Sequence, residues 1–261
     1  MIWVFLCLLF LLGLIAGSFL NALQWRLPQS KTMWGRSECV HCHHPLAPKD
    51  LIPVLSFLFL GGRCRSCRKP IPGAYPLTEL AMAMLFVLAG SLWIRGDSFS
   101  TLSVLDFLSL GRNLLALSVL AAIFLIDLRT FLIPDELTIP SIAVFAVLNL
   151  WLGMTWTSLL AGVLVGGGFF LFLYLVTRGR GIGDGDIRLG ALMGVLVGWP
   201  HIFLAIFFSY MIGAPVAILL LALKKKTLKD PIPFGPFLTF SAALVLLFGS
   251  VMLEQVMFVF E

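Results

Sequence analysis

Long apolar stretches separated by short polar ones are the main pattern along this chain of 261 residues. About 20 apolar residues are needed to cross the hydrocarbon core of a bilayer as a helix. Windows of that kind predict eight membrane helices, at 2–23, 75–94, 113–126, 137–153, 158–176, 189–199, 202–223 and 237–256. The third and sixth windows are short, so we expect them to extend into neighbouring polar residues or to begin as partly unwound ends.

The predicted fold is therefore an all-α integral membrane protein of about eight transmembrane helices. One long polar loop, at 24–74, separates the first two helices, and the later connections are short. Small residues spaced four apart allow helices to approach closely in lipid. Such spacings predict close packing at Gly13/Gly17, Gly162/Gly166 and Gly190/Gly194/Gly198.

Composition supports this class. The chain is 60% hydrophobic and 12% charged, whereas charged residues make up about a quarter of a soluble domain. The first apolar stretch lacks a basic flank and is too long for a cleaved signal peptide, so we expect a retained membrane helix.

Lys and Arg predict the orientation. If the N-terminus lies outside the cytoplasm, all 18 basic residues except Arg95 and Arg112 fall on the cytoplasmic side. This asymmetry is the positive-inside pattern. The net charge of +5 is then explained by basic loops beside anionic lipid, and no nucleic-acid partner is expected.

The long polar loop contains two similar cysteine segments, "CVHCHHPL" (39–46) and "CRSCRKPI" (64–71). Each has a Cys-x-x-Cys turn followed by proline and an aliphatic residue. Four such thiolates suit a tetrahedral Zn²⁺ without an open position, so Cys39, Cys42, Cys64 and Cys67 predict a structural zinc site.

Other interpretations of the cysteines remain open. Two disulfides or a redox pair would use the same residues, although a reducing cytoplasmic compartment disfavours disulfides. The neighbouring histidines are competing ligands but are expected to be exposed loop residues, at His41, His43 and His44. Cys7, in the first helix, is predicted to be a small buried apolar residue.

Three acids near predicted helix ends are the candidate chemistry. Asp127 ends the third apolar window, and Asp184 and Asp186 lie in the glycine-rich turn "RGRGIGDGDIRLG" (178–190). The predicted topology places both segments at the same depth on the cytoplasmic side. Two neighbouring carboxyls share a proton, so one can act as a base and the other as an acid in peptide hydrolysis.

Less specific roles are also possible for these acids. Asp135 and Glu136 are expected to stabilise a helix N-terminus, and Asp184 or Asp186 could do the same. Asp127 could form an ion pair with Arg129 or Arg188, and intramembrane acids also mark proton or ion pathways. Glu79 and Asp106 have weaker claims, and the glycine run lacks the spacing of a nucleotide-binding loop.

Taken in order, several motifs resemble one family. They are "GLIAGSFLNALQWRLP" (13–28), the two cysteine segments, "YPLTEL" (75–80), "IDLRTFLIPDELTIP" (126–140), "GIGDGDIRLGALMG" (181–194) and "IPFGPFL" (232–238). Together they are similar to the bacterial type IV prepilin leader peptidase/N-methyltransferases, which are aspartyl proteases with a GxGD motif. Arg188 stands where many relatives have lysine.

The resemblance implies catalytic roles for Asp127 and Asp186, with Gly183 and Gly185 supporting the motif and Asp184 at its variable position. It implies cleavage of leaders from type IV prepilins and type II secretion pseudopilins, after a glycine, at the cytoplasmic face of the cell inner membrane. It also implies N-methylation of the new terminus with S-adenosyl-L-methionine. The expected division is a first helix (1–23), a zinc loop (24–74) and a peptidase domain (75–261).

Two competing hypotheses place the same residues in other classes. A transporter or proton channel would use the paired aspartates as a relay. A membrane-anchored assembly protein would use the cysteine loop to bind a cytoplasmic partner, and its acids would be structural.

Overall fold

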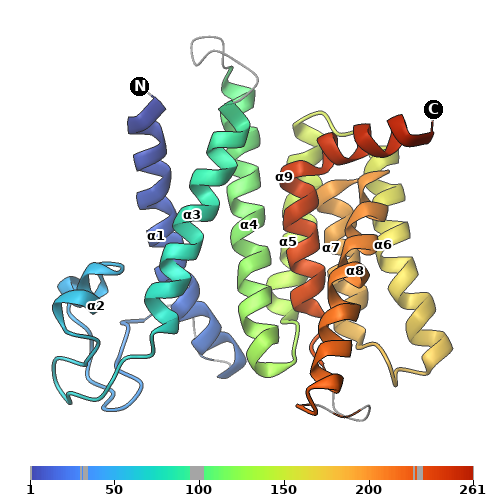
Figure 1. Ribbon diagram of the computed structural model, residues 1–261. Helices are drawn as coiled ribbons and strands as arrows, with labels where there is room; N and C mark the ends of the chain where they lie inside the picture. The colour runs from blue at the N-terminus through green and yellow to red at the C-terminus, as the bar shows by residue number, and fades with distance from the viewer. Residues whose placement is uncertain are drawn as a thin grey trace. The chain divides into compact units, whose positions relative to one another are not determined.

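The computed structural model describes residues 2–29, 31, 35–94, 103–225, 227 and 232–260. Apart from two isolated β-bridges in the cysteine loop, this part of the chain forms helices, turns and loops (Figure 1). The helices are α1 (Ile2–Arg26), α2 (Leu55–Phe59), α3 (Ala74–Ile94), α4 (Val104–Thr130), α5 (Asp135–Trp151), α6 (Trp156–Thr177), α7 (Asp184–Val197), α8 (His201–Ala222) and α9 (Gly235–Phe260), with short 3₁₀ turns η1 (Leu27–Gln29) and η2 (Pro48–Leu51). The predicted external Arg95 lies outside the described residues, as do Lys226 and Lys229.

Six helices, α1, α3, α4, α6, α8 and α9, are long and apolar enough to cross a membrane, within the part of the chain described. The chain is therefore an all-helical, multi-pass membrane protein. Each of the eight predicted windows falls largely within a helix. However, α5 and α7 have only 17 and 14 residues. At 1.5 Å per residue α7 is about 21 Å long, less than the hydrocarbon thickness of about 30 Å.

The third and sixth windows extend into polar sequence, as expected. α4 begins at Val104, because Ser103 and Asp106 cap it reciprocally. The Asp106 carboxylate accepts from the Ser103 amide at 2.8 Å, and the Ser103 hydroxyl accepts from the Asp106 amide at 3.3 Å. This exchange satisfies amides that a helix N-terminus leaves without partners. α7 likewise begins at Asp184, five residues before its predicted apolar window.

The chain divides into two compact units, Met1–Leu110 and Gly111–Glu261, and each is described by itself. In the first unit α1 packs on α3 with backbones in contact, because a Cβ at Gly13 or Gly17 would overlap the backbone of Ala83 or Glu79. The predicted close packing through this glycine pair is confirmed.

A second glycine seam joins α6 to α7 in the second unit. A Cβ at Gly166 would overlap the Gly190 carbonyl, and one at Gly194 would overlap the Gly162 carbonyl. This seam confirms the other predicted glycine packing. Around α7 the core is apolar and fully buried, at Leu120, Ile123, Phe145, Phe170, Leu189, Leu192 and Met193.

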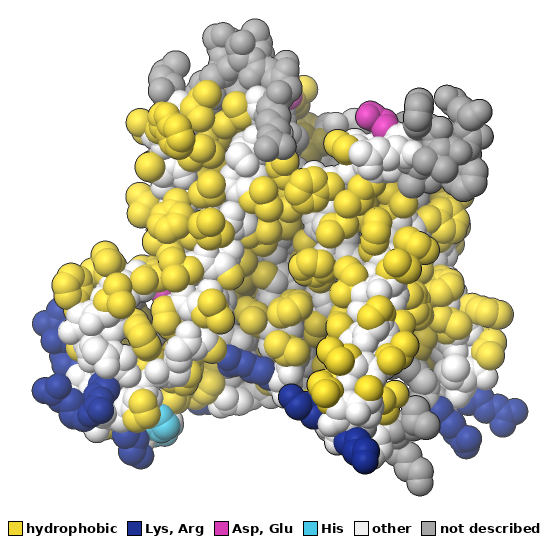
Figure 2. Space-filling model, viewed as in Figure 1, with side chains coloured by type: hydrophobic (Ala, Val, Ile, Leu, Met, Phe, Trp, Pro, Cys, Tyr) yellow, Lys and Arg dark blue, Asp and Glu magenta, His cyan; other side chains and the backbone are white. Residues whose placement is uncertain are grey.

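The outer surface of the helices is also apolar, as a lipid environment requires. Hydrophobic side chains cover the visible flanks of the helices in each unit (Figure 2). Lys and Arg instead gather at helix ends and in the loops (Figure 2). In the second unit, Arg178 and Arg180 are exposed at the end of α6.

One prediction about the first helix is wrong. Cys7 is exposed on the surface of α1 and is not buried in the protein. In a membrane an outward apolar side chain meets lipid, so it needs no protein partner.

Candidate functional site

Asp127 is buried near the C-terminal end of α4, with 4% of its surface exposed. The backbone amide of Gly235, the first residue of α9, interacts with its carboxyl group. A Cβ at Gly235 would overlap that carboxyl, so only glycine lets the start of α9 lie this close. The Oδ2 atom of Asp127 has no hydrogen-bond partner among the described residues.

Asp186 is the third residue of α7 and is 7% exposed. Its Oδ2 accepts a hydrogen bond from the Gly183 amide at 3.1 Å, and its own amide donates to the Gly183 carbonyl at 3.2 Å. One carboxylate oxygen of Asp186 therefore caps the N-terminus of α7, which is one of the predicted roles of this residue. Gly185 lies against Ile133, where an added Cβ would be 3.0 Å from the Ile133 Cβ.

The two buried acids come together in the second unit. Two carboxyls that lie close together repel when both are ionised. These two residues, 59 positions apart in the sequence, lie at the C-terminal end of α4 and in the first turn of α7. Of the ion pairs between described residues, none includes either acid.

Asp184 has different surroundings from Asp186. Its Oδ2 accepts from Arg188 Nη2 at 2.7 Å, and its side chain is 74% exposed. Arg188 Nη1 also donates to Asp135 Oδ2 at 2.7 Å. The suggested pairing of Arg188 with Asp127 is therefore not found, because the guanidinium binds two other acids.

Asp135 and Glu136 lie in the first turn of α5, as predicted. No side chain caps α5 through its N-cap residue, Pro134. The acids there act through the helix dipole, and Asp135 also acts through its pair with Arg188.

Gly235 is a site residue to which the sequence analysis assigned no role. It belongs to "IPFGPFL" (232–238), which was noted only as part of the family resemblance. A glycine between aromatic and proline residues at a helix start was the available signal. Its role follows only from the tertiary structure, in which the start of α9 packs directly against the Asp127 carboxyl group.

The far end of α7 is held by a buried arginine. Arg112 donates from Nε to Asn149 Oδ1 at 2.7 Å and from Nη2 to the Leu196 carbonyl. Asn149 Nδ2 in turn donates to the Val195 carbonyl at 2.5 Å. These bonds satisfy carbonyls in the last turn of α7, where a positive charge also suits the helix dipole.

The four cysteines of the polar loop gather in the first unit. Their sulfur atoms all lie within 4.8 Å of one another, and Cys39 Sγ is 3.9 Å from Cys67 Sγ. Four sulfurs at tetrahedral positions about 2.3 Å from a metal would be about 3.8 Å apart. The cluster could therefore hold a metal ion.

The two cysteine segments have the same backbone structure, 25 residues apart. In each segment, the backbone amide of the first cysteine donates a hydrogen bond to the carbonyl of the residue five positions later. The residue just before that acceptor has a left-handed backbone conformation, with positive φ. The first segment has Cys39 to His44 at 3.1 Å with φ 56° at His43, and the second has Cys64 to Lys69 at 2.9 Å with φ 60° at Arg68. The internal duplication in sequence is thus also one in structure.

The thiols of the cluster differ in acidity, and the pKa of Cys42 is raised to about 11, in part by burial and by the neighbouring thiols Cys39 and Cys67. Backbone amides of Cys67 and Ser66 directed at the Cys64 sulfur lower the pKa of that thiol to about 7, which favours the thiolate that binds metals. None of the five cysteines forms a disulfide. The three histidines are exposed, as predicted, and are not part of the cluster.

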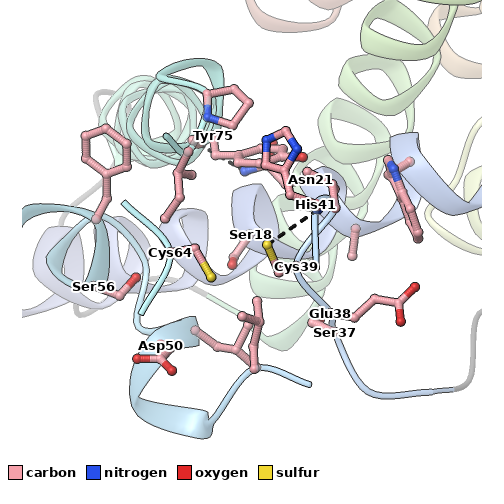
Figure 3. Close-up of a pocket in the computed structure, with 18 of the residues that line it drawn as sticks. Ser18, Asn21, Ser37, Glu38, Cys39, His41, Asp50, Ser56, Cys64 and Tyr75 are labelled. Carbon is pink, nitrogen blue, oxygen red and sulfur yellow. Dashed lines mark hydrogen bonds between the residues drawn. The ribbon is translucent and has the colours of Figure 1, made fainter. Parts of the chain in front are cut away.

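A cavity of about 590 Å³ lies beside this cluster within the first unit. Cys39 and Cys64 form part of its wall, together with Ser18 and Asn21 of α1 and Tyr75 of α3 (Figure 3). Buried Glu79 of α3 also lines it.

Two family models match the chain. A family model described as "Bacterial Peptidase A24 N-terminal domain" matches residues 11–93, and one described as "Type IV leader peptidase family" matches residues 114–218. No solved structure matches the chain.

Similar curated proteins carry one name, prepilin leader peptidase/N-methyltransferase. The protein from Aeromonas hydrophila is 34% identical over 95% of this chain and 92% of its own length. The one from Burkholderia pseudomallei (strain 1026b) is 36% identical over 92% of this chain and 84% of its own length. The one from Bacillus subtilis (strain 168) is 34% identical over 94% and 95%.

The paired acids and multi-pass helices thus occur in a chain of the A24 peptidase class. More closely, the chain belongs to the type IV prepilin leader peptidase/N-methyltransferase family.

Proposed function

We propose that this protein is an aspartyl endopeptidase that removes the leader from type IV prepilins and type II secretion pseudopilins. Asp127 and Asp186 are its catalytic residues, with Gly183 and Gly185 holding the turn around Asp186. The observation that carries the proposal is the convergence of two buried carboxyls, one of which has an oxygen without a hydrogen-bond partner in the described structure. The relatives' shared name supplies the substrate class.

Hydrolysis by this pair follows from their unequal protonation, since two adjacent carboxyls do not both ionise easily. The ionised carboxylate takes a proton from water, and the water oxygen bonds to the scissile carbonyl carbon. The other carboxyl protonates the carbonyl oxygen, giving a tetrahedral diol. The first carboxyl then protonates the nitrogen as the C–N bond breaks, and the diol returns a proton to the second carboxylate.

The surroundings of the three acids favour Asp186 over Asp184 as the partner of Asp127. Asp184 is exposed and is neutralised by Arg188, so its charge is engaged at the surface. Asp186 is buried and has one carboxylate oxygen held by the Gly183 amide. That hydrogen bond orients the carboxyl, and its other oxygen is available for the reaction.

We further propose that the catalytic acids face the cytoplasm at the inner membrane of a bacterium. In the second unit, Arg129 lies with Asp127 in the last turn of α4, and Arg188 follows Asp186 near the start of α7. Arg178 ends α6. The positive-inside rule assigns such ends to the cytoplasmic side. Prepilin leaders cut there would keep their apolar helix in the bilayer.

The cysteine cluster is proposed to hold a structural Zn²⁺. Four thiolate ligands would fill the tetrahedral coordination of the ion, which then stabilises the loop and has no open position for substrate. The sulfur separations fit such an ion. The relatives' name also supports a second activity, N-methylation of the trimmed pilin with S-adenosyl-L-methionine as donor.

The experiment is cleavage of a purified prepilin in detergent by wild type, Asp127→Asn, Asp184→Asn and Asp186→Asn. We expect cleavage by wild type and Asp184→Asn and none by the other two. A dead Asp184→Asn beside an active Asp186→Asn would contradict the proposed pair. If the wild type does not cut the prepilin but conducts protons in liposomes, the proposal is replaced by the relay hypothesis.

A further inference from the structure

We propose that residues 51–59 of the polar loop (the anchor segment) bind the bilayer surface. Their apolar side chains insert into lipid beside the membrane helices of the first unit, while basic residues of the same loop contact anionic headgroups. The anchor segment comprises the last residue of η2 and the whole of α2. The proposal requires only a chain that spans a membrane, so it does not depend on the peptidase or on the metal.

The anchor segment exposes large apolar side chains although it belongs to the polar loop. Phe59 is 86% exposed and Leu58 is 65% exposed. Leu51, Ile52 and Leu55 are exposed as well. Apolar exposure concentrated in this way marks a surface that contacts a membrane or another protein. With five residues, α2 is too short to cross the bilayer itself.

The other side of α2 already packs within the loop. An added Cβ at Gly62 would lie 3.1 Å from Cζ of Phe57, and the Gly62 amide donates to the Phe57 carbonyl at 2.9 Å. Phe57 and Leu60 are half-buried. One face of α2 is therefore used by the protein, and an apolar face is left outward, as in segments that lie in the plane of a membrane interface.

Attachment to α3 sets the depth of the anchor segment. The amide of Val54, which directly precedes α2, donates to Glu79 Oε2 at 2.7 Å. Glu79 is the sixth residue of α3, so this contact lies about 7.5 Å along the helix from its start. Interfacial segments insert about 5–10 Å into the boundary between headgroups and acyl chains. Because α3 is long and apolar enough to cross a membrane, α2 begins beside a span and not in the aqueous phase.

The packing of α1 gives the same result. A Cβ at Gly17 would overlap the Cα atom of Glu79, so these two residues lie at one level of the helix pair. From Gly17, α1 continues to Arg26, a further distance of about 13.5 Å at the α-helical rise. The level of Glu79, and of Val54 bound to it, therefore lies inside the ends of both helices.

Charge in the loop is arranged to suit a lipid surface. The loop, 24–74, contains eight basic residues and two acidic ones. Lys49 and Arg63 lie on either side of the anchor segment, and both are exposed. Figure 2 shows hydrophobic side chains over the α2 part of the first unit, with Lys and Arg along its outer and lower edge. An apolar layer followed by a basic one matches acyl chains followed by anionic headgroups, so the depth and the charge together favour lipid as the partner.

Insertion of the anchor segment also positions the cysteine cluster. The segment lies between the two cysteine segments in the sequence, 39–46 and 64–71. When it is inserted, both cysteine segments are held at the membrane surface, and the loop that they close cannot extend into the aqueous phase.

The test is photocrosslinking of the full-length protein in lipid nanodiscs that contain phosphatidylglycerol. The photoreactive residue p-benzoylphenylalanine is placed at position 59 or, as the matched control, at position 44. Phe59 and His44 are both exposed rings of the same loop, but His44 lies outside the anchor segment. Crosslinks to radiolabelled phospholipid are counted, and thermal unfolding of the same samples shows that each variant is folded.

Amide hydrogen exchange over residues 55–60 is the second measurement. It compares wild type, the double variant Leu58→Ser/Phe59→Ser and the control His44→Ser in the same nanodiscs. Both replaced side chains of the double variant are largely exposed, so a role confined to packing within the protein would leave the exchange rate unchanged.

We expect at least fivefold more lipid crosslinking from position 59 than from position 44. Crosslinking from position 59 should decrease in nanodiscs of neutral phosphatidylcholine, because the basic residues then lose their headgroup partners. The double variant should exchange the amides of 55–60 at least tenfold faster than wild type, and His44→Ser should exchange them at the wild-type rate.

Equal lipid crosslinking from the two positions, or an unchanged exchange rate in the double variant, would overturn the proposal. Equal crosslinking in anionic and neutral nanodiscs would overturn its headgroup contact. If position 59 crosslinked to added prepilin in place of lipid, the surface would be a substrate site. If it crosslinked to a second copy of the chain, the surface would be a dimer interface, and either result would replace the proposal.

Discussion

Replacing Gly235 by alanine tests how closely the start of α9 controls Asp127. The new Cβ would overlap Asp127 Oδ2 and lie 3.0 Å from Cγ and 3.4 Å from Cβ of the same residue. Carbon atoms make their best contact at about 3.5–4.0 Å, so the carboxyl or the helix start must move. Turning the carboxyl off its rotamer costs about 0.5–1.5 kcal/mol, and the overpacking costs about 1–3 kcal/mol in stability.

The effect on catalysis should exceed the effect on stability. Displacing a reacting group by about 1 Å costs about 10²-fold in rate, so we expect Gly235→Ala to lower kcat/KM for prepilin cleavage by about that factor. The assay is cleavage of purified prepilin in detergent, with thermal unfolding measured on the same samples.

Gly168→Ala is the matched control. Gly168 also lies in a helix of the second unit, but an added Cβ there meets nothing within 4 Å. We expect its cleavage rate to equal that of the wild type and its stability to change by less than about 0.5 kcal/mol. Wild-type cleavage by Gly235→Ala, or an equal loss in both variants, would refute the reasoning.

Three further predictions concern the acids, the metal and the far end of α7. A plot of cleavage rate against pH should be bell-shaped. The rate falls at low pH because Asp127 and Asp186 are both protonated, and at high pH because the proton that they share is lost. A rate that keeps rising with pH would contradict the proposed pair. Elemental analysis of the wild type should find about one Zn²⁺ per chain. The Cys39→Ser variant should lose this zinc, and the control variant Cys7→Ser should keep it. Wild-type protein that is purified without chelator and contains no metal would contradict the proposed zinc site. Arg112→Met should lower the unfolding temperature, since each buried acceptor left without its donor, such as the Leu196 carbonyl, costs about 1–3 kcal/mol; an unchanged temperature would show that water or another group replaces the arginine.

Much of the fold could be predicted because lipid imposes simple rules on sequence. Every predicted apolar window falls largely within a helix, and the glycine pairs at Gly13 and Gly17 predicted a real helix contact. Apolar pattern could not tell which side of a helix is buried, because lipid-facing and protein-facing residues are equally apolar. The exposure of Cys7 follows from that ambiguity.

The candidate site was predicted in part. Charge counting predicts the same membrane depth for Asp127 and Asp186, and in the structure both acids are buried in the second unit. The partners of Arg188 could not be predicted, because acids on several helices are candidates and only the packing of those helices decides which ones reach the guanidinium. Gly235 was missed for a similar reason, since its role depends on how α9 meets α4 and not on any local pattern.

The contact between Arg112 and the last turn of α7 has a consequence for control of the enzyme. α7 is a short helix with the proposed catalytic Asp186 in its first turn and Arg112 bound to Leu196 in its last turn, about 15 Å further along at the α-helical rise. A shift at one end of such a helix moves the other end with it. A small molecule that displaced Arg112 would therefore be expected to act on the proposed catalytic Asp186 from the other end of α7, without occupying the site itself.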